Sequence, residues 1–365
     1  MTPRAPASDV EPVLASPLEP PHPIDPGEVA ELLLGGRRTL SREMVAELAG
    51  VSVSDARRFW HALGFPVDDL DQGSLTEADL LALFRLAELI RENRLPKATA
   101  LAMTRAVGRT ADRLGSWQVT LLAEHLGQDP QAPNDDAQFS DPVTAQRVAA
   151  QVIALADDLE PMLVYAWRRH LVDAVGRLLS DAARADDGDH ALVGVPRFVG
   201  FADLVSFASV VRRLSDSELA AAVQRFEAVA SDIVTAHGGR VVKTVGDEVL
   251  YTTRTPVPGV AIGLDLIDAF ATDAVLPEIR VGCAYGPVVS RLGDVFGTTV
   301  NRAARLTSIA NAGAVLADSA LATALVSQSG FHVKPQRRRT LRGVGMVTPH
   351  IVTRETTSSR LRRQP

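Results

Sequence analysis

The sequence contains only one cysteine, Cys283, among its 365 residues. A lone cysteine excludes an intrachain disulfide and any zinc site built from several cysteines, and it is typical of proteins from a reducing compartment. Apolar stretches are also short, because charged residues interrupt each of them well before the roughly eighteen residues that a membrane-spanning helix requires. We therefore expect a cytoplasmic protein with no transmembrane segment.

Positive charge is not in excess either. Lys and Arg total 38 against 44 Asp and Glu, which gives a formal net charge of -6. Affinity for nucleic acid without sequence preference comes mainly from clustered Lys and Arg, so the composition argues against a general nucleic-acid partner. Apolar residues are plentiful at 46% of the chain. That is enough for one large domain or two ordinary domains with buried cores.

The first part of the chain changes from a proline-rich segment to a helical pattern. Residues 1–26 are rich in proline and lack periodic apolar residues, which predicts a disordered tail. From residue 27 onward, apolar residues recur at intervals of three and four, the spacing of amphipathic helices. Helix signals agree, because Gly50 is placed where a helix should end and both 52–55 and 76–79 match the capping-box pattern. An all-helical N-terminal domain is expected.

A second change in pattern follows the acidic segment 186–189 (DDGD). Before it, 143–184 continue the helical spacing as predicted transmission helices, so that the helical domain covers 27–190. After it, short β-rich runs alternate with helices in the order β-α-β-β-α-β over 191–352, and a basic flexible tail is expected at 353–365. We therefore predict an α+β protein, in which a helical regulatory domain precedes a ferredoxin-like antiparallel sheet with helices packed on one face.

Polar residues interrupt the second half at points where the pattern indicates strand ends and turns. Asp203 follows the apolar strand 198–202, and a carboxylate there either caps the next helix or binds a metal ion. Two β-rich runs meet at Gly246 and Asp247, where glycine permits the positive φ of a tight hairpin. Each feature alone has an ordinary structural explanation.

A third polar run, 292–305 (LGDVFGTTVNRAAR), predicts the start of a helix. Thr298 or Thr299 is suited to cap that helix. Asn301 and Arg305 are four residues apart on it and therefore share a face. Taken singly, Arg305 would be an ordinary solvated surface charge.

In this order and at these intervals, the three runs resemble the catalytic domain of class III adenylyl and guanylyl cyclases over nearly all of 191–352. The resemblance implies that Asp203 and Asp247 bind two Mg²⁺ ions per active site, which Mn²⁺ can replace. It also implies that Asn301 positions the ribose, while Arg305 neutralises charge that builds on the α-phosphate. The implied reaction converts ATP into 3′,5′-cyclic AMP and pyrophosphate without a covalent enzyme intermediate.

The base of the nucleotide is read in this family by two residues that match Lys243 and Asp294. Adenylyl cyclases of the family have a lysine and an aspartate there, whereas guanylyl cyclases typically have a glutamate and a small polar residue. A lysine can donate to a ring nitrogen of adenine, and an aspartate can accept from its amino group. The O6 atom of guanine would face that carboxylate unfavourably. The resemblance therefore implies ATP as the substrate.

The same family assembles each active site from two protomers, with the metal-binding aspartates on one and the other four residues on its partner. Because this chain carries both sets, the resemblance implies a symmetric homodimer. One family position departs from the pattern. A lysine that contacts phosphates has no clear match in 340–345 (TLRGVG), where Arg342 is the available substitute, and this contact stays open.

The N-terminal half allows two interpretations. The spacing in 41–65 is typical of a helix-turn-helix, in which Arg57 and Arg58 would face a DNA groove, although the surroundings lack a basic stripe. A soluble helical domain joined directly to a cyclase domain also resembles the autoinhibited, pH-sensing adenylyl cyclases of mycobacteria and related actinobacteria. That resemblance implies a regulatory domain with a small effector, protons or a lipid. The histidines suited to titrate between pH 5 and 8 are His61, His125 and His170.

Three functions are consistent with these features. They are a regulated adenylyl cyclase, a helix-turn-helix regulator with a cyclase-like sensor or dimerisation domain, and a degenerate cyclase domain that only dimerises. None of the six positions expected in the active site is substituted, which favours the enzyme.

Overall fold

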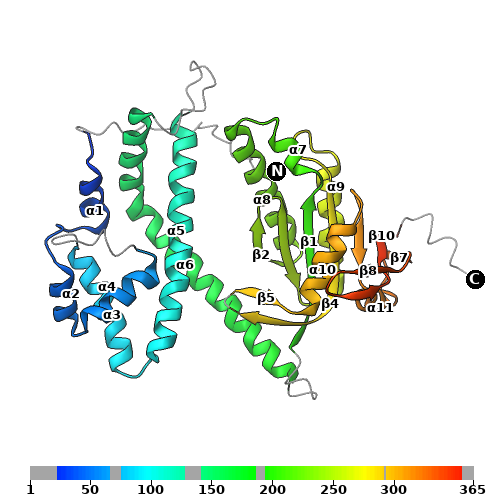
Figure 1. Ribbon diagram of the computed structural model, residues 1–365, viewed down its shortest axis with the longest axis horizontal. Coiled ribbons are helices and arrows are strands. Elements are labelled where there is room, and N and C mark those ends of the chain that lie inside the picture. The colour runs from blue at the N-terminus through cyan, green and yellow to red at the C-terminus, as the bar shows by residue number, and fades with distance from the viewer. Residues whose placement is uncertain (1–22, 66–74, 128–140, 186–193, 292, 356–365) are drawn as a thin grey trace, which may run out of the picture. The chain divides into compact units, whose positions relative to one another are not determined.

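The structure, a computed structural model, divides into two compact units, Met1–Val172 and Asp173–Pro365 (Figure 1). We call these the helical unit and the sheet unit. The residues that the structure describes are 23–65, 75–127, 141–185, 194–291 and 293–355. In this part of the chain, no helix has both the length and the apolar composition that crossing a membrane requires.

Several predicted segments fall outside the described residues. These are most of the tail at 1–26, the boundary segment at 186–189 and most of the tail at 353–365. Helix α1 begins at Pro26, and the last strand ends at Arg354, two residues beyond the predicted end of the second domain.

The helical unit contains the helices that the apolar spacing predicts. They are α1 (Pro26–Leu34), α2 (Arg42–Ala49), α3 (Val53–Leu63), α4 (Glu77–Arg91), α5 (Lys97–Gly127) and the first part of α6 (Pro142–Ala185). Helix α2 ends at Gly50, whose φ of 67° lies in the left-handed region that favours glycine. At the start of α4, Thr76 and Asp79 form the complete capping box. At the start of α3, Ser52 accepts a hydrogen bond from the backbone N–H of Asp55 at 3.1 Å.

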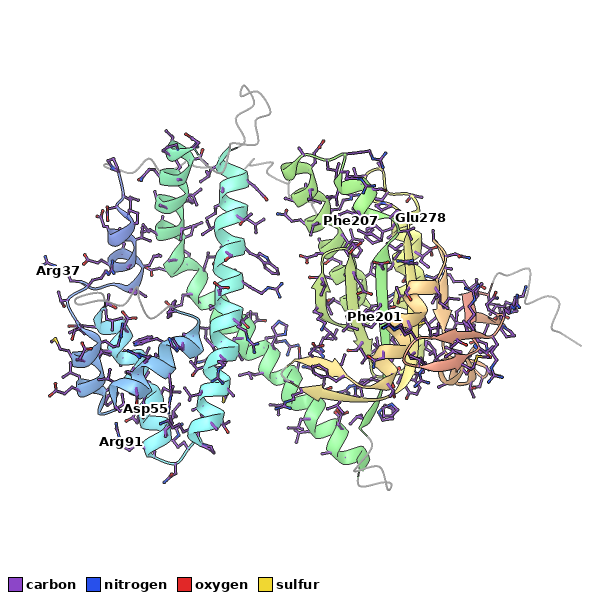
Figure 2. The ribbon with its side chains drawn as sticks, viewed as in Figure 1. Arg37, Asp55, Arg91, Phe201, Phe207 and Glu278 are labelled. Atoms are coloured by element: carbon purple, nitrogen blue, oxygen red, sulfur yellow. The ribbon has the colours of Figure 1, made fainter. Side chains whose placement is uncertain are left out.

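A small core holds α2, α3 and α4 together. Phe59 and Trp60 of α3 pack edge to face, with ring centroids 4.6 Å apart. The buried residues around them are Val45, Ala46, Ala49, Ala56, Leu75 and Leu83. Asp55 of α3, which is labelled in Figure 2, also pairs with Lys97 at the start of α5, with 2.6 Å between the charged atoms. Arg57 and Arg58 are exposed, and DNA binding by this helix pair stays a prediction.

Helix α6 is a single helix of 44 residues, Pro142–Ala185, where the sequence predicts transmission helices at 143–184. It begins in the helical unit and ends in the sheet unit. Pro161 lies inside it, where proline removes one backbone hydrogen bond of the helix. Close to its C-terminal end, Asp181 pairs with Arg197 of the first strand, with 2.5 Å between the charged atoms.

The sheet unit has the predicted order β-α-β-β-α-β, followed by further strands and helices. Its strands are β1 (Val195–Leu204), β2 (Arg240–Val245), β3 (Glu248–Thr253), β4 (Ile279–Arg291), β5 (Asp294–Phe296), β6 (Val315–Ala317), β7 (Phe331–Pro335), β8 (Arg339–Leu341), β9 (Gly345–Val347) and β10 (His350–Arg354). Its helices after α6 are α7 (Phe207–Val211), α8 (Asp216–Ala236), α9 (Pro256–Ala271), α10 (Thr298–Ile309) and α11 (Ser319–Leu325). The α+β class predicted from the sequence is confirmed.

The main sheet has the strand order β2-β3-β1-β4-β6-β10-β7 among the described residues, with β5 paired to β4 and with β8 and β9 as a separate hairpin. All of its pairings are antiparallel except the one between β4 and β6. The central strands β1 and β4 alternate their side chains between two faces, so each face has its own core.

Helices cover both faces of this sheet, and the expectation of helices on one face only is wrong. Phe226 of α8, Leu266 of α9 and Leu321 of α11 belong to the core of one face. Ala303 of α10 belongs to the core of the opposite face, with Phe201 of β1. The physical reason lies in β4. A Cβ atom on Gly282 would lie 2.0 Å from the backbone nitrogen of Thr307, so glycine lets α10 approach the strand closely.

Candidate active site

The two predicted metal-binding aspartates lie at one end of the central strands. Asp203 is near the end of β1, and Asp247 is in the turn between β2 and β3. The backbone N–H of Leu204 donates to the carbonyl oxygen of Asp247 at 3.0 Å, which fixes the turn against the end of β1. In the antiparallel pairing of β1 with β3, Asp203 lies opposite Glu248. Fold and register therefore bring the two aspartates together.

Asp203 has a cationic neighbour that the sequence analysis missed. Arg280 lies opposite Asp203 in the pairing of β1 with β4. Its Nε atom and one terminal nitrogen each lie 2.6 Å from Oδ2 of Asp203. The two residues are 77 positions apart in the sequence, so only the strand pairing reveals the contact. The one local signal is a charged residue inside the apolar strand 279–284.

Charge and burial at this end of the sheet favour a bound cation. Burial raises the pKa of Asp203, Arg280 counteracts this by its hydrogen bond and charge, and Asp247 raises it again, so the net direction is upward. Burial, with the charges of Asp203 and Asp247, raises the pKa of Glu248 to about 7. Carboxylates that disfavour one another's ionisation in this way are stabilised when a cation binds between them.

The donor set fits a hard divalent ion. Asp203 and Asp247 supply carboxylate oxygens, which Mg²⁺ and Mn²⁺ accept as ligands. Among the described residues, no cluster of three or more His, Cys, Asp or Glu side chains forms a closed metal cage. Mg²⁺ usually binds proteins through one or two carboxylates and takes its other ligands from water and substrate phosphates. The two aspartates are therefore suited to hold a metal ion whose remaining ligands come from water and from the phosphates of the substrate.

The two predicted base-reading residues meet directly. Lys243 of β2 and Asp294 of β5 form an ion pair with 2.7 Å between Nζ and Oδ2. Arg240 supports this contact, because its guanidinium donates to the carbonyl oxygen of Gly293 at 2.9 Å. Burial raises the pKa of Asp294, but the hydrogen bond from Lys243 and the neighbouring charges outweigh it, so the net direction is downward. Asp294 is thus held as a charged acceptor beside a charged donor.

Asn301 and Arg305 are both exposed on α10, one turn apart. The predicted threonine cap of this helix is wrong. The residue before the helix is Gly297, with a φ of 131°, and it makes no side-chain capping bond. Thr299 is buried and its hydroxyl donates to the carbonyl oxygen of Pro287 at 2.8 Å, so it anchors the helix to β4 instead.

The six predicted residues therefore form separate groups in one chain. Asp203 lies beside Asp247, Lys243 lies beside Asp294, and Asn301 shares a helix face with Arg305. Across the described ranges, no hydrogen bond or ion pair joins the aspartate group to the residues of α10.

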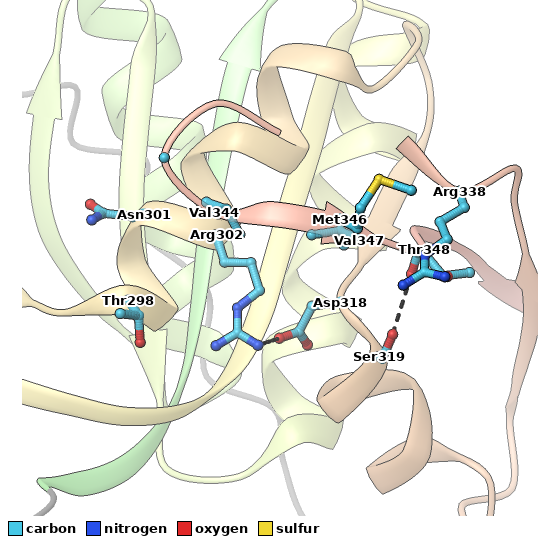
Figure 3. Close-up of a pocket in the computed structure, with 11 residues that line it drawn as sticks. Thr298, Asn301, Arg302, Asp318, Ser319, Arg338, Val344, Met346, Val347 and Thr348 are labelled. Carbon is cyan, nitrogen blue, oxygen red and sulfur yellow. Dashed lines mark hydrogen bonds and ion pairs between the residues drawn. The ribbon is translucent and has the colours of Figure 1, made fainter. Parts of the chain in front are cut away.

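A cavity of about 390 Å³ opens beside the start of α10 (Figure 3). Asn301 lines it, and Arg302 crosses it to pair with Asp318 at 3.0 Å. Its remaining walls come from the start of α11 and from the hairpin of β8 and β9. The residues of those walls are Ser319, Arg338, Gly343, Val344, Met346, Val347 and Thr348, and Thr298 completes the lining. Arg342 is exposed in the turn of the hairpin and does not line the cavity.

Comparison with known proteins shows which family the second half of the chain matches. Residues 198–354 match the family model described as the adenylate and guanylate cyclase catalytic domain. A protein of Streptomyces coelicolor named adenylate cyclase is 39% identical, over 92% of this chain and 92% of that protein. A Glutamicibacter nicotianae protein of the same name is 38% identical, over 87% of this chain and 79% of that protein.

A further relative also matches over most of the chain. It is a Mycobacterium tuberculosis protein named pH-sensitive adenylate cyclase, 28% identical over 83% of this chain and 76% of that protein. The matches to all three relatives extend beyond the sheet unit into the helical unit, because each covers more than four fifths of the chain. The chain belongs to the family of adenylate and guanylate cyclase catalytic domains.

Proposed function

We propose that this protein is an adenylate cyclase that converts ATP into 3′,5′-cyclic AMP and pyrophosphate. The observation that carries the proposal is the pairing of Lys243 with Asp294, 51 residues apart in the sequence and 2.7 Å apart in the fold. Together they present a donor and an acceptor, the pattern that adenine complements and guanine does not. Family membership supports the reaction class.

In the proposed reaction, the ribose 3′-oxygen of ATP forms a bond to the α-phosphorus. The bond from that phosphorus to the bridging oxygen breaks, and pyrophosphate leaves while the 3′-hydroxyl loses its proton. Asp203 and Asp247 would hold two Mg²⁺ ions per active site, or Mn²⁺ in their place. When bound, the ions would lower the pKa of the 3′-hydroxyl and offset charge on the phosphates.

The exposed face of α10 is suited to bind the ribose and the α-phosphate of the nucleotide. Asn301 has an amide that can both donate to and accept from the ribose hydroxyls. Arg305 carries a planar guanidinium that can hold two oxygens of the α-phosphate as charge increases there. Both residues stand one helical turn apart, so one nucleotide could contact both.

The proposal requires two copies of the chain. Cyclase domains of this family bind nucleotides and act as dimers. We infer a homodimer in which Asp203 and Asp247 of one protomer face Lys243, Asn301 and Arg305 of the other. The presence of both sets of residues in this one chain supports this inference. A complete active site would then combine groups from both copies.

A complementation experiment tests the shared site. Asp203→Ala and Asn301→Ala are each expected to lower the rate of cyclic AMP formation by a factor on the order of 10³, because each removes a group that acts in the transition state. Mixing the two variants under conditions that exchange subunits should restore up to about a quarter of the wild-type rate per protomer, since half of the dimers are mixed and each has one intact site.

The control is a mixture of Asp203→Ala with Asp247→Ala, two changes in the same group. This mixture should stay inactive, because every site lacks one aspartate. Restored activity in the control, or none in the first mixture despite demonstrated subunit exchange, would contradict the shared site. A rate with GTP equal to that with ATP would contradict the substrate assignment.

We also propose that the helical unit regulates the enzyme and that α6 transmits the state of this unit to the sheet unit. The proposal is supported by α6 being one continuous helix that begins in the helical unit and ends in the sheet unit. Protons or a lipid are the proposed effectors. His61, His125 and His170 are exposed on α3, α5 and α6. Replacing the three with glutamine and measuring activity from pH 5 to 8 tests the proton effector. An unchanged pH profile would reject it.

A further inference from the structure

Strand β2 holds the start of β5 at two successive residues. The guanidinium of Arg240 donates to the carbonyl oxygen of Gly293 at 2.9 Å, and Nζ of Lys243 donates to Oδ2 of Asp294 at 2.7 Å. Gly293 has a φ of 83°, in the left-handed region that favours glycine. Two cationic side chains of one strand therefore converge on adjacent residues of another.

A bulge in β2 brings these two side chains to the same face of the sheet. In a regular strand, residues three apart point to opposite faces. The pairing of β2 with β3 shifts register between Val241 and Lys243, so β2 has one extra residue there, which reverses the alternation after it. Arg240 and Lys243 therefore share a face. Thr244, the next residue, donates to Glu227 of α8 on the other face.

The carboxylate of Asp294 is tied to its own backbone. The backbone N–H of Val295 donates to Oδ1 of Asp294 at 2.8 Å, so the position of the carboxylate depends on what holds this segment of the chain. One contact is the ion pair with Lys243, but its donor and acceptor are the groups that an adenine base would use. The hydrogen bond from Arg240 to Gly293 does not involve these groups, so it can persist when a base is bound.

We propose that Arg240 is a positioning residue that sets the preference for adenine over guanine by holding Asp294 at a fixed place beside Lys243. This inference rests on the proposed function, which assigns the base to those two residues. A carboxylate that can move away loses its contact with the amino group of adenine and no longer opposes the O6 atom of guanine. A single carbonyl oxygen needs only one donor, so a lysine is a fair substitute for this arginine.

The test measures, on the full chain, the ratio of kcat/KM with ATP to kcat/KM with GTP. Arg240→Met should lower this ratio about tenfold, mainly through a loss with ATP, because a charged hydrogen bond is removed. Arg240→Lys should restore most of the ratio. The matched control is Arg225→Met in α8, which removes an exposed arginine paired with Asp273 and should change the ratio less than about twofold.

A second background connects the effect to Asp294. In Asp294→Ser, adding Arg240→Met should change the ratio less than about twofold, because no carboxylate remains to be positioned. An equal loss with ATP and GTP in Arg240→Met would mean that the arginine acts on stability alone. That result, or the same fall in the ratio in the Asp294→Ser background, overturns the inference and leaves the proposed function in place.

Two analogues separate the inference from the proposed function. The 3′-deoxy forms of ATP and GTP lack the attacking hydroxyl, so calorimetry in the presence of Mn²⁺ measures their binding without turnover. Arg240→Met should reduce the preference for 3′-deoxy-ATP by about the factor seen in the rates. This reduced preference in a protein that forms no cyclic AMP rejects the proposed function and retains the role of Arg240. An unchanged preference overturns the inference, whatever the rates.

Discussion

The sheet unit and the long helices differ in how much apolar surface they bury within one chain. Helix α9, with 16 residues, buries seven of them. Helix α5 has 31 residues and buries three small ones, Ala100, Thr104 and Gly108. Meanwhile Trp117 of α5 is 51% exposed and Trp167 of α6 is 57% exposed. The sheet unit is therefore stabilised by its own core, whereas the long helices gain little stability from the few residues that they bury. Segments with few buried contacts are those that open or change partners most easily.

The largest effect is expected in the core of the sheet unit. Phe226 is fully buried in α8 and packs against Phe270 with 5.5 Å between ring centroids. Phe226→Ala should lower the free energy of unfolding by about 3–5 kcal/mol, because it creates a cavity under the sheet. Calorimetry on the full chain should show this loss in one transition only. A matching shift in the transition of the helical unit would mean that the two units unfold together.

A comparable change in the helical unit should stay local. Trp60 is 2% exposed at the centre of its small core. Trp60→Ala should lower the free energy of unfolding of the helical unit by about 3 kcal/mol, near the lower end of the range for large aromatic residues. The reason is that Trp60 is one of few large side chains in this small core. Hydrogen exchange should increase in α2, α3 and α4 and stay constant in β1 and β4. Increased exchange throughout the sheet would show that the sheet unit depends on the helical unit.

Removing the helical unit should raise catalysis by a smaller amount. The sequence alone suggests a cut near residue 184, but Asp181 pairs with Arg197 in the sheet unit, so the cut belongs at the unit boundary after Val172. We expect the remaining fragment to form cyclic AMP several-fold faster than the full chain, a change of about 1 kcal/mol, because autoinhibition is lost. An equal or lower rate in a fragment that is still dimeric would argue against autoinhibition.

The smallest effect is expected on the exposed face of α5. Trp117 contacts Arg113 through its ring, with 5.0 Å from the guanidinium carbon to the ring centroid. Trp117→Gln removes this exposed cation–π contact and should change the unfolding free energy by less than about 1 kcal/mol. Chemical denaturation measures the change. A loss of several kcal/mol would show that another surface covers this face of α5.

Local signals in the sequence predict the helices and strands well, because these elements depend on residues that are close together in the sequence. Strands β2 and β3 meet at the predicted turn of Gly246 and Asp247, and α2 ends at the predicted glycine, Gly50. Placement on the sheet depends on contacts between distant residues. The spacing of residues along the sequence does not show that α10 packs on the opposite face. That position depends on Gly282 of β4, and the neighbours of β4 are set by the topology of the whole sheet.

The candidate site shows the same limit. Spacing alone did not connect Lys243 with Asp294; the resemblance to the cyclases suggested both residues, and the fold places them in contact. The charge of Arg280 inside an apolar strand was the one local signal at that position, and it did not identify Asp203 as the partner, because the pairing arises only when β1 and β4 align. The roles of the six residues in catalysis stay predictions until the variants are measured.

The uninterrupted length of α6 also fixes an angle. At about 1.5 Å and 100° per residue, each residue added to this helix of 44 residues changes the rotational phase of the side chains that follow it in the helix. One residue inserted after Pro161 would turn everything that follows by about 100°, whereas seven inserted residues would turn it by only about 20°. The number of residues on either side of Pro161 therefore sets which faces of this helix line up along its length.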